Sequence, residues 1–375
     1  MITALAFSTI EAIDRCAWND CFADGPQDWD YYRCVEQAGI TDFQWRYLAL
    51  YEDDVLIAAA VAFITAYSLD TRAQGLGRRI CQQLRQWWPG LFEVRTYVLG
   101  APLTHGSQVA TAPSIDSSRR PALLDQLLSL ARSDADHAGI GLLAVKDASD
   151  RDPQWLQTCR EAGLQSLPER PDAELSVAFG SVDAYLGSLD NTTRRDLRRL
   201  LRGQGPRVEW RRSVEDVLPR MMALYETSLA QRKQSAQRLP PAWFQQLFEH
   251  LDSRVVCVLY WVGDELVAFN LVMLDKQRLV DKLFAHDQSR TVDQHWPLRR
   301  WLVNVSYCIE HRIAIYASGK ATDANTRHLG CSLTGNTLFF RHRNPALDTL
   351  LRVVKVLIRA DRSAPVMAAA ISETR

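Results

Sequence analysis

Two distant stretches of the chain carry nearly the same pattern. Residues 48–63 read LALYEDDVLIAAAVAF, and residues 258–273 read VLYWVGDELVAFNLVM. Each stretch has an apolar run, a short polar turn and a second apolar run, and this pattern predicts a β-hairpin. Asp54 in the first turn corresponds to Asp264 in the second. A hairpin that recurs in this way indicates that one fold is used twice in the chain.

The segments that follow the two hairpins also correspond in order. In each half we expect a third strand, a polar loop, a long helix, a further strand, a short helix and a last strand. The strands and long helix of the first half are expected at 93–99, 118–138, 139–150 and 173–179, and those of the second half at 278–286, 296–311, 312–323 and 332–341. The pattern therefore predicts an α/β fold with a mixed sheet flanked by helices, built as two tandem domains.

The length of the chain agrees with this division. At 375 residues it exceeds the usual size of a single hydrophobic core, and two domains of roughly 180 residues each are expected. We place an N-terminal domain at 1–180, a connecting basic helix at 181–205 and a C-terminal domain at 206–375. We expect the C-terminal domain to carry the active site.

Charge and composition exclude several classes of protein. The 44 Lys and Arg residues balance the 44 Asp and Glu residues, so we expect no DNA partner. The chain has no basic start followed by a long apolar run, and no stretch approaches ~20 uninterrupted apolar residues. We therefore expect a cytoplasmic protein without an integral membrane segment. The eight cysteines form no Cys-x-x-Cys pair, and we expect no metal site.

The connecting segment 191–202 reads NTTRRDLRRLLR, and it predicts a helix with Asn191 or Thr192 as its N-cap that Gly203 terminates. Its arginines share one face of this helix, while its leucines point the other way. Two readings of the basic face stay open. It is either an ordinary solvated surface or a site that holds a phosphorylated carrier or nucleic acid.

The order of elements and several local patterns resemble a known family. The patterns are YLGSLDNTTRRDLRRLLR at 185–202, LYETSLAQRK at 224–233, GDELVAFNLVMLD at 263–275, IAIYASGKATDANTRHLG at 313–330 and LFFRHRNP at 338–345. Together they resemble the GNAT-superfamily acyltransferases of the FemAB-like type, which contain two tandem GNAT folds. The resemblance implies a transferase that moves an acyl or aminoacyl group directly from an activated donor to an amine.

The same resemblance implies the partners of the reaction. The acceptor would be an amine-bearing small molecule or peptide. The donor would be acyl-CoA, an acyl-carrier protein or aminoacyl-tRNA, used as a co-substrate rather than held as a tightly bound cofactor. The residues leave the choice among these donors open.

Two places in the first half could hold the phosphates of such a donor. Residues 72–77 read RAQGLG, which fits a phosphate-binding glycine pattern, but the comparison of halves puts this segment before the third strand. The loop after the third strand is the better position, and there we select Thr104, His105 and Gly106 as donor-binding residues. In the second half the corresponding loop is 287–297.

The candidates for catalysis lie in the second half. His286 stands at the end of a predicted strand and could act as a base near neutral pH, although a surface histidine is the alternative. Strict alternation along 278–286 would put Asp281 on one face and Lys282 with His286 on the other. We select Asp281 as a further catalytic residue, with a structural ion pair as the alternative. The family resemblance implies that Tyr316 protonates the leaving group.

The candidates for substrate binding surround these residues. Asn270 interrupts an apolar strand and could hold an amide or carbonyl group, or it could mark a bulge. The other candidates are polar groups on and after the strands of the second half, namely Lys282, Ser318, Lys320, Arg327 and His328. They could bind a carboxylate, a phosphate or the end of a tRNA, and a solvated surface is the alternative.

Two functions other than catalysis fit the same sequence. The chain could be a non-catalytic ligand-binding module that keeps the GNAT fold, since neither donor loop contains the glycine pattern. It could also be an RNA-binding protein that uses the arginine-rich helix at 191–202. An acyltransferase is the leading hypothesis.

Overall fold

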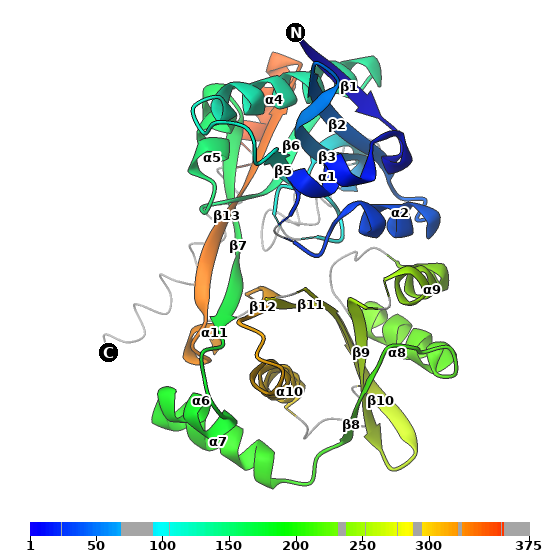
Figure 1. Cartoon of the computed structure of the whole chain (residues 1–375), viewed down its shortest axis with the longest axis vertical. Coiled ribbons are helices and arrows are strands. Elements are labelled where there is room, and N and C mark those ends of the chain that lie inside the picture. The colour runs from blue at the N-terminus through cyan, green and yellow to red at the C-terminus, as the bar shows by residue number, and fades with distance from the viewer. Residues whose placement is uncertain are drawn as a thin grey trace. The chain divides into compact units, whose positions relative to one another are not determined.

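The computed structural model describes residues 1–23, 25–68, 93–104, 106–231, 238–251, 253–275, 277–287, 295–321, 325–353 and 355. It divides the chain into two compact units (Figure 1). Unit 1 contains Met1–Cys21, Thr41–Glu169 and the described residues from Asn336 onward, and unit 2 contains Phe22–Ile40 and Arg170–Gly335. Within the described parts of the chain, every helix is too short or too polar to cross a membrane.

Unit 1 is a mixed sheet with helices packed against it. Its strands are β1 (Ile2–Phe7), β2 (Gln44–Glu52), β3 (Val55–Ser68), β4 (Glu93–Leu99), β5 (Val109–Thr111) and β6 (Leu142–Ser149). The helical segments are η1 (Ile10–Ala12), α1 (Arg15–Cys21), α4 (Arg120–His137) and α5 (Pro153–Glu161). The strand order is β1-β2-β3-β4-β6-β13, where β13 is Ser332–His342, with β5 beside β3, and β4 runs parallel to β6.

Unit 2 repeats this plan. Its strands are β8 (Arg207–Arg211), β9 (Val255–Val262), β10 (Glu265–Leu274), β11 (Arg278–His286) and β12 (Ile315–Lys320). Its helices are α2 (Trp29–Gln37), α6 (Val182–Ser188), α7 (Asn191–Arg202), α8 (Leu218–Gln231), α9 (Pro241–His250), α10 (Trp296–Glu310) and α11 (Asn325–His328). The strand order is β7-β12-β11-β10-β9-β8, and β11 runs parallel to β12.

Both predicted hairpins form, and they share an irregularity. The first connects β2 to β3 through Asp53 and Asp54, which both have positive φ, and the second connects β9 to β10 through Gly263. Positive φ at these positions matches the right-handed twist of the paired strands. In each hairpin the register shifts because one residue of the second strand is unpaired, Ile57 in β3 and Val267 in β10. These two residues occupy corresponding places in the repeat, so the two halves share their backbone geometry as well as their pattern.

The last strands of the two halves are exchanged between the units. β7 (Gln165–Ser176) follows α5 in the chain, yet it pairs in unit 2 with β12. β13 (Ser332–His342) follows α11, yet it pairs in unit 1 with β6. Both pairings are antiparallel. Each sheet is therefore completed by a strand that comes from the other half of the sequence.

The long helix of each half covers one face of its sheet, as the apolar spacing predicts. In unit 1 α4 buries its leucines in the core, namely Leu123, Leu124, Leu127 and Leu128. In unit 2 α10 does the same with Trp301, Leu302 and Val305. Each such side chain contributes about 1.5–3 kcal/mol by burial. Helices α8 and α9 lie on the opposite face of strands β9 to β11 from α10 (Figure 1).

Candidate active site

The two parallel strands of unit 2 separate at their carboxyl ends. β11 and β12 pair from Arg278 and Ile315 only as far as Val280 and Ala317. Beyond this point β11 continues to His286 and β12 continues to Lys320, but the described residues of these two strands no longer pair with each other. In unit 1 the corresponding strands β4 and β6 stay paired through Leu99, the last residue of β4. β11 therefore extends beyond its last pair with β12, from Asp281 onward, whereas β4 of unit 1 ends at its last pair with β6.

A bulge in β11 changes which side chains face α10. The register shifts so that Leu271 pairs with Leu283 and Val272 pairs with Asp281, which leaves Lys282 as the extra residue. A bulge of this kind reverses the alternation of faces beyond it. Asp281 consequently lies on the α10 side together with Phe284, and the alternation expected from the sequence is wrong here. Lys282 points to the other face, where its ammonium lies 5.1 Å from the Tyr31 ring of α2.

Asp281 is the centre of a buried polar cluster. The Tyr316 hydroxyl donates to Asp281 Oδ2 at 3.0 Å, and Asn304 Nδ2 lies 3.5 Å from the same oxygen. Asn304 Nδ2 also donates to the Tyr316 hydroxyl at 3.0 Å. The guanidinium of Arg300 approaches from α10, with Nε 3.4 Å from Asp281 Oδ2. The structure thus brings two sequence-predicted residues, Asp281 and Tyr316, into direct contact.

Asn270 belongs to the same cluster and not to an open surface. It is fully buried on β10. With its amide nitrogen directed at Asp281, it donates to Asp281 Oδ1 at 2.8 Å and to the Leu283 carbonyl at 2.9 Å. Its oxygen then accepts from Asn304 Nδ2 at 3.0 Å. In this orientation both oxygens of the Asp281 carboxylate are hydrogen-bonded, Oδ1 to Asn270 and Oδ2 to Tyr316.

Burial dominates the electrostatics of the cluster. It raises the pKa of Asp281, and the Arg300 charge and the Tyr316 hydrogen bond oppose this rise. The pKa of Tyr316 lies well above its usual value because the ring is buried and its hydroxyl faces Asp281. The Tyr316 proton is therefore tightly held, and its side chain is 0% exposed.

A cavity of about 710 Å³ lies in unit 2 at the start of α10. It is lined by residues of four helices and strands, including Arg300 on α10, Ser318 and Lys320 at the end of β12, and His328 on α11. The start of α7 closes another side, with Asp190 and Asp196. This volume is in the range of small-molecule sites. The described residues contain no group of three or more His, Cys, Asp or Glu side chains that could hold a metal ion.

Three of the sequence-predicted binding residues line this cavity, and each has a protein contact. Lys320 Nζ forms an ion pair with Asp172 at 3.1 Å. The Ser318 hydroxyl donates to the Ala173 carbonyl at 3.3 Å. His328 Nδ1 lies 3.7 Å from Asp190 Oδ2. Arg327, also predicted, is exposed on α11 and does not line the cavity.

His286 stands at the end of β11, where its backbone is fixed by α8. Its N–H donates to Ser228 Oγ at 3.1 Å. Its half-buried imidazole stacks near the Trp296 indole, with 6.0 Å between ring centroids. Burial lowers the pKa of His286, and the nearby Arg300 lowers it further, while Asp287 raises it. The lowered pKa favours the neutral imidazole, the form that can accept a proton.

The donor-binding residues chosen in unit 1 lie in a loop with internal support. Thr104 is buried, and its carbonyl accepts a hydrogen bond from Lys146 Nζ at 2.8 Å. Gly106 has a φ of 80°, which favours glycine. His105 and the glycine-rich segment 72–77 lie outside the described residues, as does most of the loop 287–297.

Arg300 and Asn304 were missed at the level of sequence. Asn304 lies within the apolar stripe of α10, between Trp301 and Val305, and yet is fully buried. A polar residue inside such a stripe normally needs a partner, so this position carried a usable signal. Arg300 gave no comparable signal because arginine is common on helix surfaces.

The N-cap of the connecting helix α7 (Asn191–Arg202) lies before both predicted N-cap positions, Asn191 and Thr192. Asp190 is its N-cap, because Asp190 Oδ1 accepts from the backbone N–H groups of Thr192 and Thr193 at 3.0 Å each. Arg194 is part of the local structure, since its guanidinium donates to three carbonyl groups at the end of α6. The other arginines of the helix are exposed, namely Arg195, Arg198, Arg199 and Arg202.

Comparison with known proteins agrees with this geometry. Residues 187–291 match the family model described as an acetyltransferase (GNAT) domain. No match was found among curated protein sequences. The solved structure of FemX superimposes with a TM-score of 0.58 and 12% sequence identity, covering 93% of this chain and 99% of that chain.

Two further solved structures are similar. A tandem GNAT protein from the clavulanic acid biosynthesis pathway gives a TM-score of 0.53 at 11% identity, covering 92% of this chain and 99% of that one. L-PGS from Bacillus licheniformis gives a TM-score of 0.50 at 11% identity, covering 86% of this chain and 90% of that one. These findings confirm the predicted tandem GNAT fold of the FemAB-like type. They support the class of GNAT-fold acyltransferases in general.

Proposed function

We propose that the protein transfers an acyl or aminoacyl group from an activated donor directly to an amine, at the opening between β11 and β12. The observation that carries this proposal is the separation of the two parallel strands after Val280 and Ala317, which occurs in unit 2 and not in unit 1. The opening adjoins a region that matches the GNAT domain model, and unit 2 contains a cavity of about 710 Å³. The C-terminal half is accordingly the proposed catalytic half.

His286 is the proposed base. The amine nitrogen attacks the carbonyl carbon of the donor, a C–N bond forms, and the nitrogen gains a positive charge. The neutral imidazole of His286 takes the excess proton, since its pKa is lowered by burial and by Arg300. When the bond from the carbonyl carbon to the leaving sulfur or oxygen breaks, the imidazolium returns this proton to the leaving atom.

The buried cluster has a proposed positioning role. Asp281 holds Arg300 at the cavity and accepts hydrogen bonds from Tyr316 and Asn304. Tyr316 was expected to protonate the leaving group, but its hydroxyl donates to Asp281 and its side chain is fully buried. We therefore propose that Tyr316 fixes the orientation of Asp281.

The proposed substrates follow from the fold and the cavity. The acceptor is an amine-bearing small molecule or peptide, and the donor is acyl-CoA, an acyl-carrier protein or aminoacyl-tRNA. Ser318, Lys320 and His328 are the proposed contacts, because they line the cavity from three directions. Thr104 and Gly106 of unit 1 remain proposed donor contacts.

An assay with panels of the three donor types and of primary amines tests the proposal. His286→Gln is expected to lower kcat/KM by about 10²–10⁴-fold, the usual contribution of a general base. His311→Gln is the matched control, since this exposed histidine at the end of α10 stacks on Tyr307. Turnover that is unaffected in the His286 variant contradicts the assigned role. The absence of turnover with every donor contradicts the proposed function.

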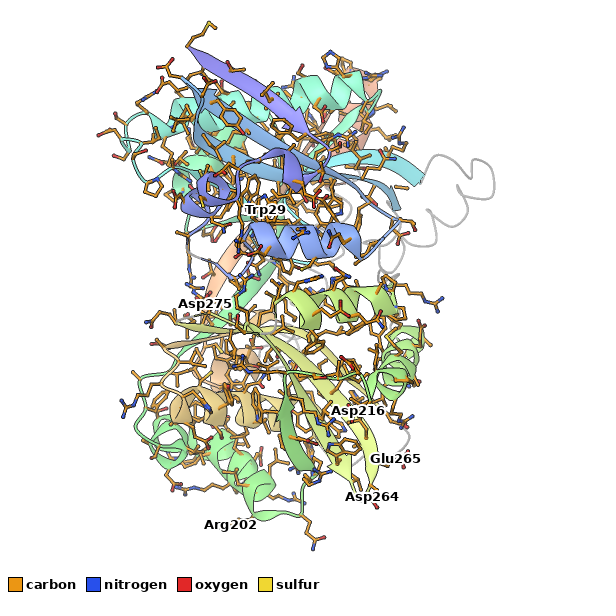
Figure 2. The ribbon with its side chains drawn as sticks, turned by 45° about the vertical axis from the view of Figure 1, so that its right-hand side comes forward. Trp29, Arg202, Asp216, Asp264, Glu265 and Asp275 are labelled. Carbon is orange, nitrogen blue, oxygen red and sulfur yellow. The ribbon has the colours of Figure 1, made fainter. Side chains whose placement is uncertain are left out.

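RNA binding is a second candidate, favoured by one observation. Four exposed arginines of α7, Arg195, Arg198, Arg199 and Arg202, have side chains that form no hydrogen bond or ion pair with the described residues. Arg202 points outward at the end of α7 (Figure 2). If all four contact single-stranded RNA, the logarithm of affinity falls with the logarithm of salt concentration with a slope of about −3. A slope near zero excludes this mode.

A further inference from the structure

Arg300 differs from the other basic residues of the cavity in which of its atoms contact a carboxylate. Lys320 is paired with Asp172 at 3.1 Å, and His328 lies beside Asp190 at 3.7 Å. Arg300 meets its carboxylate partner Asp281 through the inner nitrogen Nε, at 3.4 Å. Its two outer nitrogens, Nη1 and Nη2, form no hydrogen bond with any described residue. The end of the guanidinium is therefore available to a ligand.

The guanidinium is fixed in this position by its surroundings. Its central carbon lies 5.1 Å from the centre of the Phe284 ring, so a cation–π contact supports it. Asp281, which attracts Nε, is itself held by Tyr316 and Asn304. The Arg300 side chain is 25% exposed while that of Asp281 is 3% exposed, so the accessible part of the pair is the arginine. A rigid guanidinium loses little conformational freedom when it binds a ligand.

The acidic residues at the cavity do not neutralise this charge directly. Asp190 Oδ1 accepts from two backbone N–H groups, and its Oδ2 accepts from the Thr193 hydroxyl at 2.7 Å. Asp196 is exposed on α7, with no described contact to Arg300. Inside the cavity the outer guanidinium nitrogens thus present a positive group with two parallel donors.

We infer that the cavity binds an anionic group, a carboxylate or a phosphate, and that Arg300 is the residue that recognises it. Two parallel N–H groups match the two oxygens of either anion, and such charge-assisted pairs are among the strong hydrogen bonds of proteins. The cavity has the volume of a small-molecule site. The identity of this anion as part of the acyl donor or of the acceptor rests on the proposed function. The binding itself does not.

Calorimetric titration of the full chain with inorganic phosphate, pyrophosphate, acetate and succinate, at constant ionic strength, tests this inference. Arg300→Met is expected to weaken binding of the preferred anion by about 10–100-fold, the loss expected for hydrogen bonds to a charged group. Arg300→Lys keeps the charge but not the paired donors, so it is expected to lose part of this affinity. Preference for phosphates or for carboxylates then identifies the source of the anion.

Arg299→Met is the matched control, because the neighbouring arginine lies on the same helix and lines a different groove beside Trp210 and Tyr307. Its anion affinity is expected to equal that of the wild type. Circular dichroism of each variant shows whether the fold is kept. Equal affinity of the wild type and a folded Arg300→Met variant overturns the inference, and so does the absence of binding of every anion to the wild type. Anion binding through Arg300 without turnover of any donor would instead contradict only the proposed function.

Discussion

Replacement of Asp281 is the most demanding test of the buried cluster. Asp281→Ala removes the acceptor of the Tyr316 hydroxyl and one acceptor of the Asn270 amide, and it leaves Arg300 without its countercharge. Asp281→Asn keeps the shape of the side chain and one acceptor oxygen. The two variants therefore separate the loss of charge from the loss of the whole group.

The expected costs follow from burial. Removing one partner of a buried ion pair typically costs about 3–5 kcal/mol, and a buried donor without an acceptor costs about 1–3 kcal/mol. Water can reach Arg300, whose side chain is 25% exposed, so we expect about 3 kcal/mol for Asp281→Ala. For Asp281→Asn we expect about 1 kcal/mol at neutral pH, because the lost attraction is offset by the lower cost of burying a neutral amide.

The pH dependence of the unfolding free energy provides a second, independent test of the Asp281 environment. Because the pKa of Asp281 is raised by burial, the folded protein binds a proton more tightly than the unfolded chain does. The free energy of unfolding of the wild type, relative to Asp281→Asn, should therefore fall as pH rises from about 4, the unfolded pKa of Asp, to the raised folded pKa.

Urea unfolding followed by tryptophan fluorescence, at several pH values from ~4 to ~8, measures both effects. Double replacement with Arg300→Met supplies the control. In that background Asp281→Ala should cost less than it does alone, because no arginine is left without its countercharge. A cost below about 1 kcal/mol for Asp281→Ala, or a difference from Asp281→Asn that does not change with pH, would refute the reasoning.

Three further predictions concern other parts of the chain. If His286 is the base, kcat/KM should fall on the acidic side with an apparent pKa below the ordinary pKa of histidine, because burial lowers the pKa of His286. Arg300→Met should move this fall to higher pH, because the Arg300 charge also lowers the pKa of His286. Arg194→Ala should lower the unfolding free energy by about 1–3 kcal/mol in urea, since three carbonyl groups of the α6–α7 turn lose their donor. Lys146→Met should cost about 3 kcal/mol, measured in the same way, because Lys146 Nζ pairs with the buried Asp147 carboxylate at 2.5 Å and donates to two loop carbonyls. An effect below experimental error in either urea experiment would show that the contact contributes nothing.

The local elements of this protein were accessible from its sequence. Periodicity predicted the two hairpins and both core helices, and the structure confirms them within a few residues. Matching the halves predicted a duplicated fold, and the family resemblance implied that this fold is of the GNAT type, which the comparisons confirm. These features depend on neighbours in the chain, where a period of two or of 3.6 residues determines which side chains can be buried together.

The composition of the candidate site was accessible only in part. Asp281 and Asn270 were selected because each polar side chain interrupts an apolar strand, and Tyr316 was selected from the family resemblance. The structure brings all three into one buried cluster. Their roles were not visible in the pattern. The bulge at Lys282 reverses the faces of β11, and a strand pattern read alone assumes that no such bulge exists.

The sequence by itself determined that a hairpin-based fold occurs twice and where its two hairpins and two core helices lie. It placed the last strand of the first half at 173–179, whereas β7 spans Gln165–Ser176. The tertiary structure alone decided that β7 pairs in unit 2 and β13 in unit 1, because strand pairing is a long-range choice that local sequence does not determine. It also decided that β11 and β12 separate in unit 2, and that Arg300 reaches Asp281 from a helix that follows in the chain. The position of a charge relative to a buried carboxylate depends on how a helix packs on a sheet, and no local pattern encodes that distance.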